Sequence, residues 1–321
     1  MFLENKISVV IPCYNVKDTV TDAVSSAYAS KDVFVEVICV DNNSNDGTFD
    51  LLQSLKSKFN ELIILKEEKP GANCARNRGL KQAVFTWIQF LDADDVLDPN
   101  KLANQIEIAK KAKPEVSFIA GAYLKRDLKS LDKKVEVNEN GLISVFTGNA
   151  GITSSNLWRK SSLDSVGGWN ENYLSSQETE LMFRLIANGF TYLEDKNHLT
   201  IVRERELGQI SKSNPKTRLR QYILVRLGII EFIQKKNIVF ESSNLDELYD
   251  FLVVTLIELS LYDKNDAASI FNAHVNDKWK EANNFGMNWF KKFLIKTLGF
   301  KNFCIVFNFF TVSSKIRIIA P

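Results

Sequence analysis

Three carboxylates follow an apolar run in the segment IQFLDADDVLDP at residues 88–99. Asp92, Asp94 and Asp95 have no basic residue among them. Carboxylates gathered in this way repel one another and also repel a phosphate, unless a cation lies between them. A hard divalent cation such as Mg²⁺ or Mn²⁺ binds carboxylate oxygens on one side and phosphate oxygens on the other. The cluster therefore predicts a divalent metal beside a phosphorylated ligand.

Three further polar segments follow apolar runs: PCYN at 12–15, DNNSNDGT at 41–48 and PGANCARNRG at 70–79. Taken singly, each is typical of a turn or a helix cap. Taken together, they offer Asp41 as an acceptor for a base or ribose edge, and Arg76 with Arg78 as positive charge near phosphates. The glycine patterns of dinucleotide-binding proteins and P-loop proteins are missing from the sequence, which disfavours both classes.

The elements that would position these segments alternate along the first part of the chain. Apolar runs at 7–12, 35–40, 62–65, 87–91 and 116–123 predict buried strands. Helix-compatible stretches at 17–30, 46–59, 73–84 and 99–112 lie between them. This alternation predicts an α/β fold of Rossmann-like type, a mostly parallel central sheet with helices on both faces. Because ligands bind at the carboxyl ends of parallel strands, we expect the four polar segments to form one site.

The pattern changes twice further along. Residues 125–152 are charged and irregular, and a helix follows in SQETELMFRLIANG with Gly189 as its C-cap. After the polar loop 203–215, helical periodicity is predicted at 216–236, 244–262 and 265–282. We therefore expect a catalytic domain at 1–211 and a helical region at 212–321, which serves packing, oligomerisation or membrane-surface association.

Bulk composition narrows the class of protein. The formal net charge of +2 gives no support to a nucleic-acid binder. The two histidines are too few for a His-rich metal site, and no apolar run is long enough for a spanning helix. The four cysteines are widely spaced and are expected to be reduced and buried, as in a cytoplasmic protein: Cys13, Cys39, Cys74 and Cys304.

The motifs SVVIPCYN, VDNNSNDGT, GANCARNRGL and FLDADD, in this order and at these spacings, closely resemble those of the family 2 inverting glycosyltransferases. The likeness covers about the first 210 residues and continues through GGWNENY and QETELMFRL. It implies a nucleotide-sugar-binding fold of GT-A type. It also implies transfer of a sugar from a nucleotide diphospho-sugar, most often a UDP-sugar, to an acceptor hydroxyl with inversion. The acceptor would be a surface glycan or its lipid-linked precursor.

The resemblance assigns roles to individual residues. It places seven in the nucleotide pocket: Pro12, Tyr14, Asn15, Asp41, Asn43, Arg76 and Asp94. Asp92 and Asn77 would border the donor sugar, and Asp94 and Asp95 would hold Mn²⁺ or Mg²⁺. Arg76 would lie near the base or the phosphates.

The general base is where this sequence departs from the family, whose members usually carry Glu-Asp at the start of a helix. Here the pair is Gln177-Glu178. Inverting transfer needs a carboxylate within hydrogen-bond reach of the acceptor hydroxyl, and Glu178 is the expected base, with Gln177 on the acceptor side. Glu180 is the rival, although residues two apart on a helix face different ways. The alternative is that both glutamates are only first-turn carboxylates favoured by the helix dipole.

Two further assignments stay open. Many relatives have a His after the Arg in the segment VRERELGQIS, where this chain has Glu206, so a third protein ligand to the metal is in doubt. Arg203 and Arg205 either reach the phosphates or are solvated loop charges. Trp158 or Trp169 could stack on an acceptor sugar, and Trp169 is the better candidate because its Gly-Gly and Asn neighbours suggest a loop. The alternative for both tryptophans is a place in the core.

The last forty residues carry six basic side chains, no acidic ones and many aromatics. This composition fits an interfacial membrane anchor at the inner face of the plasma membrane. The alternative is that these helices pack on the catalytic domain or form a homodimer. Two functions other than sugar transfer remain as alternatives for the whole protein. One is a nucleotidyltransferase, which usually needs a Gly-rich loop after the first strand. The other is a nucleotide-sugar-binding protein without catalysis.

Overall fold

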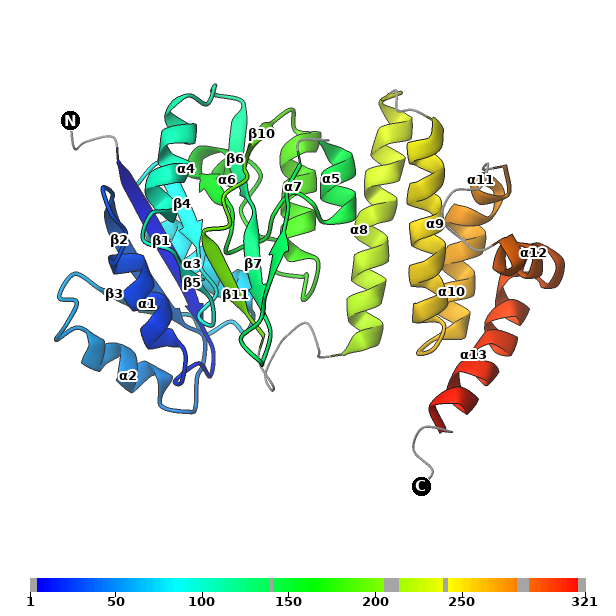
Figure 1. The fold of residues 1–321 in the computed structure, drawn as a ribbon, viewed down its shortest axis with the longest axis horizontal. Coiled ribbons are helices and arrows are strands. Elements are labelled where there is room, and N and C mark those ends of the chain that lie inside the picture. The colour runs from blue at the N-terminus through cyan, green and yellow to red at the C-terminus, as the bar shows by residue number, and fades with distance from the viewer. Residues whose placement is uncertain (1–4, 139–140, 205–213, 239–241, 282–288, 317–321) are drawn as a thin grey trace. The chain divides into compact units, whose positions relative to one another are not determined.

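The structure is a computed structural model that describes residues 5–138, 141–204, 214–238, 242–281 and 289–316. The chain divides into two compact units, Met1–Gln209 and Ile210–Pro321. The first contains both sheets, and the second is helical in its described parts (Figure 1).

A seven-stranded sheet forms the centre of the first unit, in the order β10-β6-β9-β4-β1-β2-β3. Its strands are β1 (Lys6–Cys13), β2 (Phe34–Asp41), β3 (Ile63–Lys66), β4 (Trp87–Phe90), β6 (Val116–Gly121), β9 (Leu157–Arg159) and β10 (Thr191–Asp195). Only β9 runs against its neighbours, β4 and β6. The predicted α/β class with a mostly parallel sheet is confirmed.

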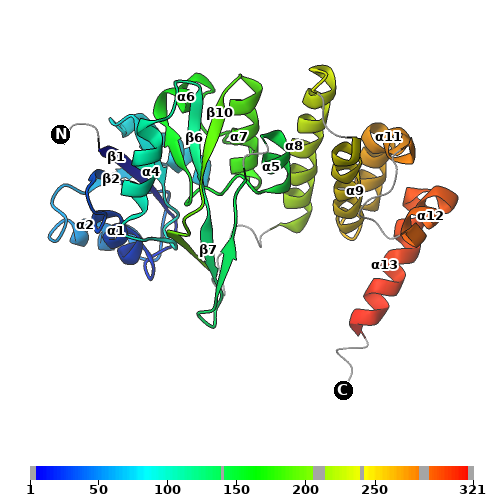
Figure 2. The ribbon, with the colours of Figure 1, turned by 45° about the horizontal axis from the view of Figure 1, so that its top comes forward.

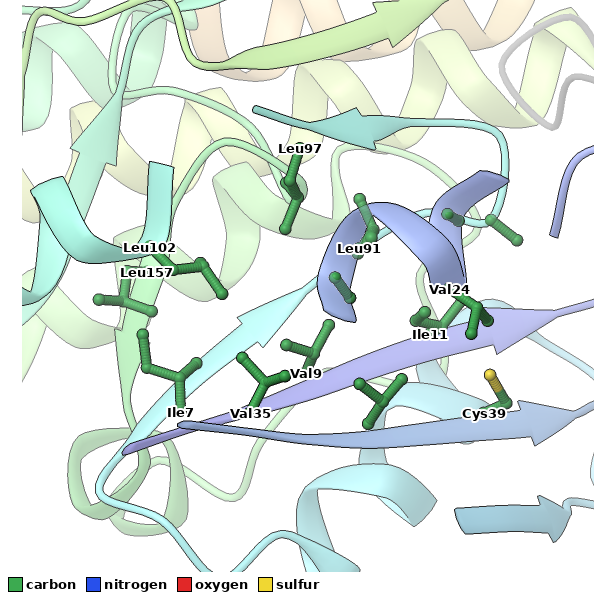
Figure 3. Packing of buried hydrophobic residues seen from close by; sticks show 14 of the residues in the cluster. Ile7, Val9, Ile11, Val24, Val35, Cys39, Leu91, Leu97, Leu102 and Leu157 are labelled. Carbon is green, nitrogen blue, oxygen red and sulfur yellow. The ribbon is translucent and has the colours of Figure 1, made fainter. Parts of the chain in front are cut away.

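Helices cover both faces of this sheet, as predicted. They are α1 (Val20–Tyr28), α2 (Thr48–Leu55), α3 (Ala72–Gln82), α4 (Lys101–Lys110), α5 (Leu142–Thr147), α6 (Lys160–Ser165) and α7 (Gln177–Ala187). Alternate residues of a strand point to opposite faces. Ile7, Val9 and Ile11 of β1 therefore pack in one apolar cluster with Val24 of α1 (Figure 3). Val10 points the other way, against Gly79 of α3.

A second, four-stranded sheet was not expected from the sequence. It has the order β5-β11-β7-β8, with β5 (Val96–Leu97), β7 (Tyr123–Arg126), β8 (Asp132–Val135) and β11 (Thr200–Arg203). The predicted strand 116–123 is divided at Ala122 into β6, which pairs with β10, and β7, which pairs with β11 and β8. The chain then leaves the central sheet, and β7 and β8 form a hairpin that projects from the first unit (Figure 2).

The second unit contains the helices α8 (Pro215–Lys235), α9 (Ser242–Leu259), α10 (Lys264–Ile270), η2 (Phe271–Val275), α11 (Asn276–Glu281), α12 (Trp289–Leu298) and α13 (Phe300–Ile316). Asn214 caps α8 by accepting from Thr217, and Pro215 occupies the first helical position, where it needs no donor. The predicted helix 265–282 is divided by the π-helical turn η2. None of the helices within the described ranges is both long and apolar enough to span a bilayer.

Candidate active site

The loops that follow β1 and β2 are joined at the carboxyl edge of the sheet. Cys13 and Asp41, the last residues of the two strands, are paired in register. Asn15 donates its backbone N–H to Ser44 Oγ at 3.1 Å and accepts the Asn45 N–H at 2.9 Å. Asn15 has a positive φ of 50°, which asparagine tolerates. Its backbone N–H and its side chain together therefore join the two loops.

The loop after β3 is fixed to the end of β2 by Asn42. Its amide nitrogen donates to the carbonyls of Glu67 (2.7 Å) and Lys69 (2.8 Å), and its oxygen accepts the Gly71 N–H (2.7 Å). Asn43, expected in the nucleotide pocket, donates to the Glu68 carbonyl at 2.9 Å. Both asparagines thus shape the loop that leads into α3.

Asp41 has the property of a ligand-binding side chain. Its relative exposure is 4%, and its Oδ1 atom has no hydrogen-bond partner among the described residues. A buried acceptor without a donor is unfavourable, and an N–H or O–H group of a ligand would remove that penalty. Pro12 is partly buried and Tyr14 is exposed on the neighbouring loop. These positions are compatible with the expected base and ribose pocket.

The acidic loop, residues 92–95 between β4 and β5, contains a buried carboxylate. Asp95 is 3% exposed, and its pKa is raised well above the usual value by burial and by the charges of Asp92 and Asp94. Hydrogen bonds from the Arg203 N–H (3.1 Å) and from Ser154 oppose this rise. Ser154 Oγ also accepts the Asp92 N–H at 3.1 Å. Sequence reasoning missed Ser154, because a buried serine in TSSN carries no local signal.

The acidic loop fits a divalent cation by its donor type. The oxygens are hard ligands, and the raised pKa of Asp95 reflects negative charge that a cation would balance. Within the described ranges, no three Asp, Glu, His or Cys side chains lie close enough to hold a metal by themselves. A cation at Asp94 and Asp95 would therefore complete its coordination with phosphate oxygens or water.

Arg203 has a role that neither sequence alternative described. Its Nε atom donates to the Asp94 carbonyl, and Nη1 donates to Asp22 Oδ2 at 2.8 Å. Arg203 therefore anchors the end of β11 to the acidic loop and to α1. Arg205 and Glu206 lie outside the described residues.

Arg76 is not where a phosphate could easily reach it. The side chain is 5% exposed, and Nη1 donates to Asn73 (2.9 Å) and to Gln177 Oε1 (2.7 Å). Nη2 pairs with Asp92 Oδ1 at 2.8 Å. The guanidinium also lies over the Trp169 ring, 4.8 Å from its centroid. Instead of free positive charge near the base or phosphates, the structure gives a buried link between α3, the acidic loop and the start of α7.

Asn73 and Asn77 extend this link along one face of α3. Residues 73, 76 and 77 share a face because three or four residues make about one helical turn. Asn73 donates to the Asn170 carbonyl at 2.7 Å. Asn77 accepts the Trp169 N–H and donates to its carbonyl, both at 2.9 Å. The Asn77 amide, expected at the donor sugar, instead holds the segment that precedes α7.

Trp169 is 2% exposed, which corrects the expectation that it stacks on an acceptor sugar. Its ring meets Phe90 and Trp158 edge to face, at centroid distances of 5.2 and 5.9 Å. Trp158 is also fully buried. The Gly-Gly and Asn neighbours do form a loop, but Asn77 binds its backbone and draws the indole into the core.

The two glutamates of α7 lie in different environments. Glu180 is buried and makes a two-pronged ion pair with Arg184, at 2.7 and 2.8 Å. Glu178 is half-buried, and no hydrogen bond or ion pair to its carboxylate is formed within the described part of the chain. A carboxylate committed to a bidentate arginine is a poor proton acceptor, so the geometry favours Glu178 over its rival.

Tyr123, at the start of β7, is a partly buried residue that the sequence analysis did not single out. Burial raises the pKa of its hydroxyl, and the negative charges of Glu178 and Asp95 raise it further. Arg76 bonds both Gln177 and Asp92, so the start of α7, where Glu178 lies, is held beside the acidic loop.

Comparisons with known proteins bear on the family and the fold. Residues 8–159 match the family described as Glycosyl transferase family 2. A glycosyltransferase assigned to teichuronic acid biosynthesis in Bacillus subtilis strain 168, TuaG, is 35% identical over 42% of this chain and 54% of its own length. The poly-β-1,6-N-acetyl-D-glucosamine synthase of Staphylococcus aureus is 26% identical over 57% of this chain and 46% of its own. The chain spans about half the length of these curated relatives.

Two solved structures have a similar fold. Residues 1–349 of S. aureus TarS, in complex with UDP-GlcNAc, superpose with a TM-score of 0.60 at 19% identity, over 86% of this chain and 79% of that one. The mannosyltransferase PcManGT from Pyrobaculum calidifontis, in complex with GDP-Man and Mn²⁺, gives a TM-score of 0.51 at 13% identity. The superposition covers 94% of this chain and 86% of that one.

Proposed function

Because residues 8–159 form a family 2 glycosyltransferase domain on a GT-A type fold, we propose that this enzyme is inverting and metal-dependent, with a nucleotide diphospho-sugar as donor. The donor of first choice is a UDP-sugar. The observation that carries the proposal is the unpartnered Glu178 carboxylate beside the acidic loop, while Glu180 is held by Arg184.

The donor side is supported by Asp41 and by the acidic loop. The Asp41 Oδ1 atom offers a buried acceptor for an N–H of the base. Asp94 and Asp95 would hold Mn²⁺ or Mg²⁺, and a bound cation would stabilise negative charge on the departing diphosphate. Asp92, fixed by Arg76, would form the border of the donor-sugar pocket.

Glu178 would act as the general base. One of its carboxylate oxygens accepts the proton of the acceptor hydroxyl while the hydroxyl oxygen attacks the anomeric carbon. The bond from that carbon to the diphosphate breaks on the opposite face, so the configuration inverts. The names of the relatives favour a surface polysaccharide or a lipid-linked glycan as the acceptor.

The second unit would bring the enzyme to a membrane surface. Phe293, Leu298 and Ile305 are exposed on α12 and α13, and Lys291 and Lys301 are exposed on the same helices. Apolar and basic side chains together fit the boundary of an anionic bilayer, where a lipid-linked acceptor would be found.

The test is a panel of UDP-, GDP- and dTDP-sugars with and without Mn²⁺, read by thermal shift, by hydrolysis and by transfer to candidate acceptors. We expect one donor to raise the unfolding temperature only with the metal. Glu178→Gln should abolish transfer and leave donor binding intact, because the amide cannot accept the proton. Glu107→Gln, at an exposed site on α4, is the matched control and should behave as wild type.

The outcomes separate the alternative functions. If no nucleotide sugar stabilises the protein in a metal-dependent way, the proposal is wrong. Stabilisation without hydrolysis or transfer would favour a nucleotide-sugar-binding protein. Full turnover by Glu178→Gln would exclude that residue as the base.

A further inference from the structure

We propose that Gln177 is a positioning residue that works only as an amide, fixing the start of α7 so that Glu178 stays beside the acidic loop. The inference rests on the proposed function, because it takes Glu178 as the base. It also gives a physical reason for the departure of this chain from the Glu-Asp pair of its family.

The side chain of Gln177 lies between two groups of opposite hydrogen-bonding character. On one side, its Oε1 atom accepts from Arg76 Nη1 at 2.7 Å. On the other, its Nε2 atom donates to the Tyr173 carbonyl at 3.0 Å. A guanidinium can only donate and a carbonyl can only accept. The residue between them must therefore accept at one end and donate at the other, which an amide does.

A glutamate at this position could form a hydrogen bond with only one of the two partners. Its carboxylate would pair with Arg76, but the second oxygen would face the Tyr173 carbonyl, with no hydrogen between two acceptors. That carbonyl would keep only a longer bond, 3.3 Å from Asn73 Nδ2. The carboxylate would also add a second negative charge to Arg76, which already pairs with Asp92. The segment before α7 would have to move to relieve both effects.

The contacts of Gln177 continue a series of hydrogen bonds between α3 and the segment before α7. Asn73 and Asn77 hold the backbone of residues 169 and 170 against α3, and Gln177 is the next contact along the chain. Helix α7 begins at Gln177, directly after Ser176 with its left-handed φ of 52°. Ser176 has no side-chain capping bond, whereas the Gln177 side chain makes two hydrogen bonds at this helix start. A shift here is passed directly to the adjacent Glu178.

The experiment compares Gln177→Glu and Gln177→Met in the full chain, using the donor and acceptor that the nucleotide-sugar panel identifies. A displacement of the base by about 1 Å lowers turnover up to about a hundredfold. We expect kcat to fall by about tenfold or more in both variants. The dissociation constant of UDP with Mn²⁺, measured by calorimetry, should change by less than about twofold, because Gln177 makes no hydrogen bond to Asp41 or Asp95 within the described residues. Gln53→Glu and Gln53→Met, at an exposed site on α2, are the matched controls.

The results distinguish this inference from the proposed function. Wild-type kcat in Gln177→Glu would overturn the requirement for an amide, and wild-type kcat in Gln177→Met would overturn any positioning role. If either occurs while Glu178→Gln is inactive, only the present inference is lost. A merely structural role would lower the unfolding temperature of the variants without lowering kcat below that temperature.

Discussion

Lys101 shows how burial alters a single side chain behind the acidic loop. It is fully buried in α4, and its ammonium group donates to Gln89 Oε1. Burial lowers the pKa of Lys101 to about 7, and the negative charge of Asp195 opposes this shift only in part. Gln89 in turn donates to the Ser154 carbonyl at 2.9 Å. The lysine therefore belongs to the polar network that supports Ser154, the serine bonded to the acidic loop.

The lowered pKa of Lys101 predicts how stability depends on pH. In the unfolded chain the lysine pKa is about 10.4, so between about pH 7 and pH 10 the unfolded state binds more protons than the folded state. The free energy of unfolding should therefore rise with pH across this window, by up to about 1.4 kcal/mol per unit. Below about pH 7 the buried ammonium opposes folding in full.

Urea unfolding of Lys101→Met at pH 6.5, 8 and 9.5 would check this prediction. We expect the free energy of unfolding of the variant to exceed that of the wild type most at pH 6.5 and least at pH 9.5. Lys111→Met, exposed just after the same helix, should follow the wild-type pH dependence. Parallel curves for Lys101→Met and wild type would contradict the lowered pKa.

Helix α3 shows at the next scale how one element organises several others. Its apolar side packs on β1, where Gly79 permits contact with Val10. Its polar side, Asn73, Arg76 and Asn77, binds the segment before α7 and the acidic loop. One helix thus connects the acidic loop to the start of α7, although these parts are more than 70 residues apart in the sequence.

The close fit of α3 against residues 168 and 169 gives a prediction with an internal control. Gly167 and Gly168 both have positive φ, 78° and 70°, so alanine at either is strained by about 1 kcal/mol. At Gly168 the new Cβ would also lie 2.6 Å from Asn77 Oδ1, whereas at Gly167 it meets open space. Urea unfolding should show Gly168→Ala to be less stable than Gly167→Ala by a further 1–3 kcal/mol or so. Equal losses of stability in the two variants would mean that the Asn77 side chain moves aside at no measurable cost in stability.

At the scale of the whole molecule, both units expose large apolar side chains, and in the second unit several of them lie on the consecutive helices α12 and α13. The first unit gathers its polar loops at the carboxyl edge of one sheet. The second exposes large apolar side chains on α12 and α13, with Phe293 55% exposed. Exposed apolar side chains next to lysines are typical of a surface that meets a partner.

Vesicle sedimentation tests whether that partner is a membrane. The full chain should bind vesicles that contain anionic lipid, and binding should weaken as salt is raised, because salt screens the lysines. Phe293→Ser with Ile305→Ser should reduce binding, whereas Val84→Ser, an exposed site in the first unit, should not. Unchanged binding in the double variant would favour the alternative of packing or dimer formation through these helices.

The sequence by itself predicted five of the seven strands of the central sheet, all but β9 and β10, together with the order of its loops and the acidic cluster. These are local properties, because periodicity and strand-end chemistry are visible within a few residues. Only the tertiary structure decided the roles of Arg76, Asn77, Trp169 and Gln177, and it revealed Ser154 and Tyr123. A side chain's role depends on the groups it meets, and these came from distant segments, as where Arg76 meets Gln177 at 2.7 Å. The residues of one motif can bind a ligand or make structural contacts within the protein. Which of these they do depends on their burial and on the partners that folding brings near them.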